Sequence, residues 1–437
     1  MVRLSLESNS TVKRFIDSIF RLALSATAKD TFILFAGNAT AAFLGFLFVL
    51  FAARFLTVSD FGVFSAVINL VTITSSVADL GLSAGLVNFI SEAFSQKKGH
   101  LANRYIKSAF IIRFLTVAMF AVIAFATAKI ISPRILASES SAAGVWAGIL
   151  ILSFFLWMFF PYVLQAKKNF IGSVSVDLSF MGVRLLALFL LVATGATLYK
   201  VFGAFVAGGV ASGLVGFWLV GTSFLREKLD TAIFKKLMRF SGWMGVSRVI
   251  SSVSGGLDIQ MLAAMLGAMA TGLYSIPSRL ASFVIVLSGS FSSVLATRLA
   301  GFGDKKVERE YILKACLTLV PLILGILAWI VFARPFILIL FGAKYLQSVG
   351  VLQALLLAVI PFVLTIPSVT AIIYAIKKPK FVGSFAIFQV SLVFISNYFL
   401  IPKFGVFGPT ITLGIINTIL AVYSWVIVFK HYWLENG

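Results

Sequence analysis

Long apolar runs recur along the whole of this 437-residue chain and limit the folds open to it. A helix needs about 20 apolar residues to cross a bilayer, and scanning the chain for runs of that length finds twelve. They lie at residues 32–55, 61–90, 108–131, 143–165, 171–195, 201–224, 240–265, 269–297, 311–333, 346–376, 381–401 and 405–429. The seventh run is the weakest, because serines and charged residues dilute it. The sequence therefore predicts an all-α integral membrane protein with twelve transmembrane helices.

The composition agrees with a membrane protein. Of the residues, 60% are hydrophobic and only 12% are charged, whereas a soluble chain carries about 25% charged residues. The net charge of +21 would favour nucleic acid in a soluble protein, but here the basic residues lie in short loops between apolar runs. That pattern is typical of a membrane surface. One cysteine and two histidines form neither a disulfide nor a His/Cys metal cluster, so we predict no metal and no other cofactor.

The distribution of lysine and arginine predicts the orientation. With the N-terminus in the cytoplasm, the cytoplasmic segments hold 24 of these residues and the outer loops hold 6. Because short cytoplasmic loops carry the basic excess, we expect a cytoplasmic (inner) membrane protein with both termini in the cytoplasm. In residues 1–31, Val12, Phe15, Ile16, Ile19 and Leu22 share a helical face. We expect this segment to lie on the membrane surface as an amphipathic helix, with binding of a soluble partner as the alternative.

A basic segment near the midpoint divides the chain into two halves of six runs each. We predict a cytoplasmic N-terminal segment (1–31), an N-lobe (32–224), a basic linker (225–239), a C-lobe (240–430) and a cytoplasmic tail (431–437). Short matches at an offset of about 210 residues, such as 61–65 with 271–275, favour an internal duplication. Because each half has an even number of helices, the repeats are parallel and should enclose a central cleft.

Polar residues in the second run follow helical spacing. They are Ser65, Asn69, Thr72, Ser76, Asp79 and Ser83, at alternating intervals of 4 and 3 residues. This spacing places all six on one face of a single helix. A polar stripe with a carboxylate is costly against lipid, so it should face protein or water. We expect it to form one wall of a cavity in the N-lobe.

Further charges lie deep within the predicted helices. Asp177 and Arg184 share a face of the fifth helix, while Arg279 shares a face of the eighth with serines. Two interpretations remain open: buried ion pairs that join the halves, or a hydrated cavity whose guanidinium excess suits a phosphate or pyrophosphate. The candidate cavity residues are Arg184, Arg248, Arg279, Asp79, Asp177, Asp258, Asn69 and Ser65. Arg54, Arg113 and Lys314 lie near predicted helix ends, and we expect them to extend toward the headgroups.

Several functional classes lack their usual signatures. The chain has no Walker A motif, so we expect no internal ATPase. No predicted loop exceeds about 20 residues, which leaves no room for a soluble catalytic domain. A membrane glycosyltransferase or glycan polymerase would need a sizeable outer loop with catalytic residues. The sequence therefore predicts a transporter rather than an enzyme.

Short segments in both halves of the chain resemble a known family. Residues 53–56, 60–66, 78–83 and 88–92 resemble the first helix pair of the Wzx-type polysaccharide (O-antigen) flippases, and residues 272–281 and 340–345 resemble their second half. These flippases belong to the multidrug/oligosaccharidyl-lipid/polysaccharide (MOP) exporter superfamily. Arg54 matches a basic family position at the end of the first helix. We include Arg54 among the candidate cavity residues with a lower rank, because it lies at a shallow depth near the end of its predicted helix.

The resemblance implies a MATE-like fold of two lobes around a V-shaped central cavity, and an alternating-access cycle. It implies translocation of undecaprenyl-pyrophosphate-linked oligosaccharides from the cytoplasmic to the outer leaflet, for polysaccharide export. The implied partners are this substrate, membrane lipids, a proton or sodium ion, a glycan polymerase and glycosyltransferases, without nucleic acid. The alternatives are a cation-coupled exporter of small drugs with the same fold, which predicts an acid-dominated cavity, and a relative that moves no substrate.

Overall fold

A computed structural model describes residues 26–434, and all the regular structure in that range is helical. The predicted amphipathic face from Val12 to Leu22 lies outside the described residues. The first helices are α2 (Ala26–Phe55), α3 (Val58–Asp79), α4 (Leu82–Ser95), α5 (Gly99–Ala126), α6 (Ala128–Ile135), α7 (Ala142–Ala166), α8 (Phe170–Val192) and α9 (Leu198–Val220). Next come α10 (Thr231–Leu299), α11 (Lys305–Thr318), α12 (Val320–Phe341), α13 (Ser348–Tyr374), α14 (Lys380–Phe404) and α15 (Gly408–Phe429). Four short helical segments, η1 (Ser223–Arg226), η2 (Ala343–Tyr345), η3 (Gly405–Phe407) and η4 (Lys430–Leu434), complete the described chain.

Ten continuous helical stretches among the described residues are long and apolar enough to cross a membrane. Two of them, Arg248–Leu299 with 52 residues and Lys380–Leu434 with 55, are too long for one crossing of a hydrocarbon core about 30 Å thick. The first breaks at Gly267, whose φ is 82°, and the second breaks at Gly405, whose φ is 59°. Division at these glycines gives twelve segments, which is consistent with the predicted twelve. The protein is thus an all-α, multi-pass membrane protein.

The second predicted helix is wrong in one respect, because residues 61–90 form two helices. Leu80 and Gly81 both have positive φ angles, 47° and 74°, and separate α3 from α4. At Gly81 a Cβ atom would lie 2.6 Å from the carbonyl oxygen of Ser241 and 2.7 Å from the amide nitrogen of Gly245. The backbone of α10 therefore passes directly beside this turn, and only glycine leaves room for it.

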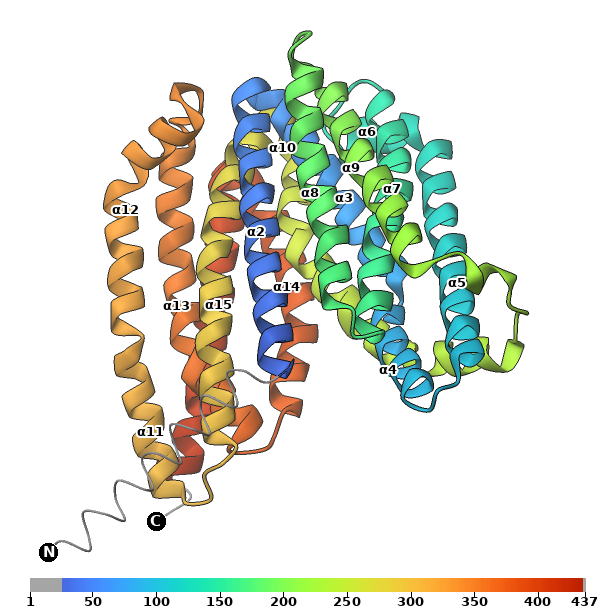
Figure 1. Cartoon of the computed structure of the whole chain (residues 1–437). Coiled ribbons are helices and arrows are strands. Elements are labelled where there is room, and N and C mark those ends of the chain that lie inside the picture. The colour runs from blue at the N-terminus through green and yellow to red at the C-terminus, as the bar shows by residue number, and fades with distance from the viewer. Residues whose placement is uncertain (1–25, 435–437) are drawn as a thin grey trace, which may run out of the picture.

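Helices α3 and α10 lie side by side and bring the two halves of the chain together (Figure 1). A Cβ atom at Gly62 would lie 1.8 Å from the carbonyl oxygen of Ala268, and one at Gly272 would lie 2.1 Å from that of Val58. Such direct backbone contact between membrane helices depends on small residues. In Figure 1, α5, α7 and α9 gather on one side of this pair, while α12 and α13 lie on the other.

A second contact joins the halves where α2 and α12 end. The Arg54 guanidinium donates to the carbonyl oxygens of Ile339 and Leu340, the latter at 2.6 Å. In return, the Lys344 ammonium donates to the carbonyl oxygens of Arg54 at 2.8 Å and Leu56 at 2.6 Å. Each cation thus binds carbonyls at the C-terminal, partially negative end of the opposite helix. Desolvation in this contact lowers the pKa of Lys344 from its ordinary value.

Candidate functional site

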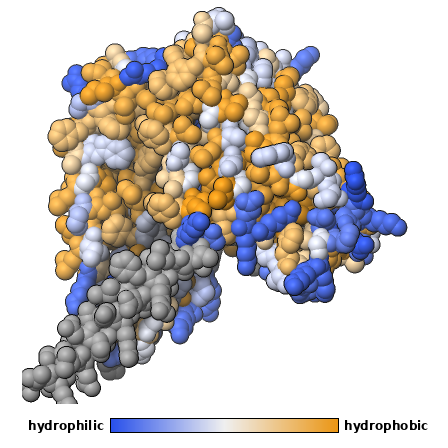
Figure 2. All heavy atoms as spheres, in the orientation of Figure 1, coloured by the Kyte–Doolittle hydropathy of each residue, from blue (hydrophilic) through white to orange (hydrophobic). Residues whose placement is uncertain are grey.

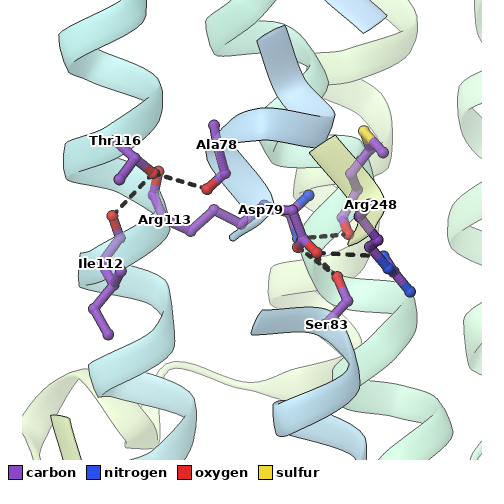
Figure 3. A network of polar contacts seen from close by, with 8 residues as sticks. Ala78, Asp79, Ser83, Ile112, Arg113, Thr116 and Arg248 are labelled. Atoms are coloured by element: carbon purple, nitrogen blue, oxygen red, sulfur yellow. Dashed lines mark hydrogen bonds and ion pairs between the residues drawn. The ribbon is translucent and has the colours of Figure 1, made fainter. Parts of the chain in front are cut away.

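Asp79, the last residue of α3, is the centre of a buried ionic cluster (Figure 3). Its Oδ1 lies 2.9 Å from Nη1 of Arg113 on α5, and its Oδ2 lies 3.3 Å from Nη1 of Arg248 on α10. The Ser83 hydroxyl, at the start of α4, donates to Oδ1 at 2.6 Å. Thr116 fixes α5 against this corner by donating to the carbonyl oxygen of Ala78 at 3.0 Å. One carboxylate therefore joins three segments that are distant in the chain.

Arg113 does not reach the membrane surface, so the expectation that it extends to the headgroups is wrong. Helix α5, which corresponds to the third predicted helix, begins at Gly99 rather than at residue 108, which places Arg113 in its middle. The residue as a whole is 1% exposed, and its Nη1 also lies 3.3 Å from the carbonyl oxygen of Met158. No spacing rule relates Arg113 to Asp79, which is 34 residues away, so the sequence held no signal for this pair.

A cavity of about 370 Å³ opens onto the cluster. Its polar lining includes Ser76, Asp79, Ser83, Arg113, Arg248 and Ser251. The Arg248 side chain is 44% exposed whereas that of Arg113 is 2% exposed, so Arg248 is the charge that a molecule in the cavity can reach. Two guanidinium groups share one carboxylate here, which leaves the cavity with an excess positive charge.

The predicted polar stripe, which runs along α3 to Ser83 at the start of α4, serves two purposes. Ser76, Asp79 and Ser83 line the cavity, but Asn69 donates to the carbonyl oxygen of Gly256 at 2.8 Å and to Gln260 at 3.1 Å. Ser65 is fully buried and lines none of the described cavities. The half of the stripe nearer Val58 therefore fastens α3 to α10, while only the half nearer Asp79 faces open space.

Arg184 and Arg279 form a second positive site. Arg184 on α8 is 7% exposed, and its guanidinium carbon lies 4.8 to 4.9 Å from the ring centroids of Phe48, Phe180 and Phe205. Arg279 on α10 lies one helical turn from Phe283, whose ring centroid lies 6.1 Å from that of Phe46 on α2, beside Gly45, where a Cβ atom would lie 3.1 Å from Nη2 of Arg184. Within residues 26–434, no carboxylate lies within salt-bridge distance of either side chain. Both Nε atoms are buried without a hydrogen-bond partner.

This pair is unusual because burial of an uncompensated charge is costly. The three phenyl rings stabilise the Arg184 guanidinium through cation–π contacts, but they cannot cancel its charge. The mutual repulsion of the arginines adds to the cost. An anion placed between them would relieve it, and guanidinium groups bind phosphate oxygens in a bidentate manner. The arrangement is therefore a candidate anion site.

The two remaining acidic candidates lie elsewhere. Asp177 accepts a hydrogen bond from Nε1 of Trp157 at 2.8 Å and pairs with no described basic group. Asp258 accepts from the Tyr274 hydroxyl at 2.7 Å and from the amide of Ile259 at 2.8 Å. Neither acid neutralises the arginine pair.

Asp258 opens onto a cavity of about 640 Å³ between α10, α13, α14 and α15. Asn397 and Thr412 also line it, and neither was singled out from the sequence. Both amide atoms of the fully buried Asn397 and the hydroxyl of Thr412 lack hydrogen-bond partners within the described residues. The available signal was a single asparagine within the apolar run 381–401.

An apolar groove of about 360 Å³ lies between α2, α10 and α12. It is lined by Phe43, Phe46, Leu280, Phe283, Trp329 and Phe336, together with two alanines. It begins beside the arginine pair, because Phe283 is one helical turn from Arg279, and a Cβ atom at Gly45 would lie 3.1 Å from Nη2 of Arg184. Figure 2 shows an apolar surface here, hollowed between α12 and α2.

Comparison with known proteins places this architecture in a family. The sequence pattern of the polysaccharide biosynthesis protein family matches residues 27–300, which is more than half of the chain. The chain belongs to this family. The match covers α2 to α10 and therefore includes the Asp79 cluster and the Arg184–Arg279 pair.

Two curated proteins are similar to this member of the polysaccharide biosynthesis protein family over most of their lengths. One, from Shigella flexneri, is named as an O-antigen transporter and is 25% identical over 391 residues, or 84% of this chain and 88% of that protein. The other, from Haloferax volcanii, is named as a low-salt glycan biosynthesis flippase. It is 23% identical over 426 residues, or 90% of this chain and 82% of that protein.

Solved structures share the fold. The lipid II flippase MurJ in an inward closed conformation matches with a TM-score of 0.72 and 18% identity, over 91% of this chain and 87% of that one. An inward-facing multidrug transporter of the MATE family, within the MOP superfamily, matches with a TM-score of 0.68 and 15% identity, over 88% of this chain and 94% of that one. The predicted MATE-like fold is thus confirmed. It does not by itself separate a lipid flippase from a drug exporter.

Proposed function

We propose that this protein flips oligosaccharides linked to undecaprenyl pyrophosphate across the cytoplasmic membrane by alternating access, for export of an O-antigen-type polysaccharide. The observation that carries the proposal is the Arg184–Arg279 pair, two largely buried guanidinium groups with no carboxylate of residues 26–434 within salt-bridge distance. A pyrophosphate supplies the missing negative charge and enough oxygens for both groups. Membership of the polysaccharide biosynthesis protein family, and the transport and flipping named for its relatives, support this substrate over other anions.

The surroundings of the arginine pair fit the rest of such a substrate. The apolar groove beside it offers an aromatic surface for the lipid chain, and burial of apolar surface is favourable wherever it displaces headgroups or water. The cavity at Asp79, with its exposed Arg248 and serines, offers hydrogen-bonding groups to hydrated sugars. During alternating access, the Arg54–Lys344 contact between α2 and α12 must part.

The proposal includes the orientation and the two lobes, 32–224 and 240–430. Twelve crossings are an even number, which supports termini on one side of the membrane. The basic excess of the loops on that side supports the cytoplasm. We further propose a glycan polymerase and glycosyltransferases as the partners that consume and supply the substrate.

A proton or sodium gradient is the proposed energy source, and the cavity at Asp258 is its proposed site. The Asp258 carboxylate, the Asn397 amide oxygen and the Thr412 hydroxyl line the same cavity and are oxygen ligands of the kind that binds hard cations.

We expect Asp258→Asn to remove the stimulation of transport by an imposed sodium or proton gradient, because the neutral amide neither binds a proton nor attracts a cation. Glu139→Gln, an exposed acid outside the cavity, is the matched control. Gradient-stimulated transport by Asp258→Asn at the rate of the wild type would contradict this assignment.

The same-fold alternative is a cation-coupled exporter of small drugs. A cavity that attracts cationic drugs needs an acidic excess. Here Arg113 and Arg248 outnumber Asp79 in one cavity, and no described carboxylate lies within salt-bridge distance of Arg184 or Arg279. The charge balance of these two sites therefore favours an anionic substrate. The cavity at Asp258 has the opposite balance, and the proposal assigns it to the coupling cation.

Reconstitution in liposomes tests the function directly. Purified protein is placed in vesicles that carry fluorescent undecaprenyl-pyrophosphate oligosaccharide in one leaflet, and its appearance in the other leaflet is followed against protein-free vesicles. We expect a protein-dependent increase. Efflux of a cationic dye from the same vesicles is the second measurement. Dye efflux without lipid transfer would support the drug exporter, and neither activity from correctly folded protein would contradict both.

A further inference from the structure

Asp177 uses its carboxylate to hold an indole. Nε1 of Trp157, on α7, donates to Oδ1 of Asp177, on α8, at 2.8 Å. No described lysine, arginine or histidine lies within salt-bridge distance of this carboxylate. A carboxylate at membrane depth with only a neutral donor is costly. Its position therefore calls for a reason other than ion pairing.

The indole leads directly to Arg184. The Trp157 ring stacks on the Phe180 ring with 4.1 Å between centroids and an interplanar angle of 3°. Phe180 in turn contacts the Arg184 guanidinium, whose carbon lies 4.9 Å from the ring centroid. Asp177, Phe180 and Arg184 are spaced by 3 and 4 residues, so they share one face of α8. A hydrogen bond, a stack and a cation–π contact thus connect Asp177 to Arg184.

Arg184 depends on this chain of contacts for its orientation. Its Nε has no hydrogen-bond partner among the described residues, and its guanidinium carbon lies 4.8 to 4.9 Å from the ring centroids of Phe48, Phe180 and Phe205. Aromatic faces hold a guanidinium without fixing its rotation as strongly as a bidentate carboxylate would. The tilt of Phe180 therefore matters. The parallel stack on Trp157 is the shortest of its ring contacts, beside the edge contacts with Phe154 and Phe205 at 6.0 Å.

We propose that Asp177 and Trp157 are positioning residues that hold Phe180, and through it the Arg184 guanidinium, opposite Arg279 for binding of a pyrophosphate. This inference rests on the proposed function, because it takes the arginine pair as the pyrophosphate site. Asp177 acts here as a hydrogen-bond acceptor, and its charge is not required. An asparagine side chain supplies the same acceptor without the charge, which makes the role testable.

Binding of inorganic pyrophosphate to the purified full-length protein is the first measurement. We expect Asp177→Ala and Trp157→Phe each to weaken pyrophosphate binding about tenfold. An Arg184 guanidinium displaced from its position loses much of its contribution to the binding free energy. The KM for the lipid-linked oligosaccharide in liposomes should rise similarly, with a smaller change in kcat. Asp177→Asn should recover most of the affinity. Trp146→Phe is the matched control, since this indole stacks on Tyr199 and contacts Phe202 in the same half, and neither ring has a cation–π contact with Arg184.

A spectroscopic measurement separates positioning from a general loss of structure. The absorbance difference between wild type and Trp157→Phe isolates the Trp157 indole. Asp177→Ala should shift that band to shorter wavelength, and Asp177→Asn should keep it, while the size-exclusion profiles stay the same. Asp177→Asn binding pyrophosphate as weakly as Asp177→Ala would overturn the acceptor role. A further loss on adding Asp177→Ala to Arg184→Ala would also overturn it, because coupled residues are not additive.

The same experiments distinguish the two levels of the argument. A wild-type protein that binds no pyrophosphate would overturn the proposed function together with this inference. A wild-type protein that binds pyrophosphate, with Asp177→Ala binding it equally well, would overturn the positioning role alone.

Discussion

Arg279→Ala is expected to reduce transport of the lipid-linked oligosaccharide by about a hundredfold. Hydrogen bonds from a charged donor contribute about 1.5–3 kcal/mol each, so the loss of a bidentate contact removes about 3 kcal/mol, or roughly two factors of ten. Arg279→Lys keeps the charge and loses the second donor, so it should lose about tenfold. The measurement is the initial rate of fluorescent lipid transfer in liposomes.

Arg298→Ala is the matched control for this substitution. Arg298 lies on the same helix, α10, but is exposed near its end, so we expect a rate close to that of the wild type. Arg184→Ala should resemble Arg279→Ala in direction, since the proposed pyrophosphate site uses both guanidinium groups. Full transport by both Arg184→Ala and Arg279→Ala, at normal expression, would show that the pair holds the halves together and binds no substrate.

Most of the fold could be predicted from apolar length, because a bilayer admits few alternatives to helices. The boundary between the seventh and eighth predicted helices, residues 265 and 269, brackets the break at Gly267. The break at Leu80 could not be predicted in this way. A leucine with positive φ is locally unfavourable, and the close passage of α10 at Gly245 accounts for it. That contact joins segments more than 160 residues apart.

The residues of the candidate site could be predicted one by one from the sequence, but their contacts with one another could not. Depth within an apolar run identified Arg184, Arg279, Asp79 and Asp258 as charges that need a partner or a function. The residue that each of these charges contacts depends on how helices that are distant in the chain pack together. Asp177 shares a face with Arg184, yet it binds an indole from α7. Arg113 was misplaced because the polar residues 99–107 hide the true start of α5, which projects beyond the apolar run.

Asp79→Ala is expected to lower the free energy of unfolding by about 3–5 kcal/mol, because removal of one partner leaves a buried charge unpaired. Arg113 is the residue left in that state, since it is 1% exposed and Asp79 is its only described carboxylate partner. Denaturation in mixed micelles, followed by the loss of helical signal, measures the effect. Arg248→Ala should destabilise much less, because the Arg248 side chain is 44% exposed and water can solvate what remains of the cluster.

The double variant Asp79→Leu/Arg113→Leu tests whether the cost arises from the unpaired charge. Replacement of a buried ion pair by apolar residues is often neutral or stabilising, so this variant should unfold close to the wild type and recover most of the loss. It should still transport poorly, because Arg248 loses the carboxylate that places it at the cavity. Equal destabilisation by Asp79→Ala and by the double variant would show that the packing of these side chains, and not the pairing of their charges, stabilises the fold. That result would remove the electrostatic basis for this site. Measuring the free energy of unfolding and the transport rate separately therefore distinguishes a structural role of Arg113 from a role of Arg248 in the substrate path.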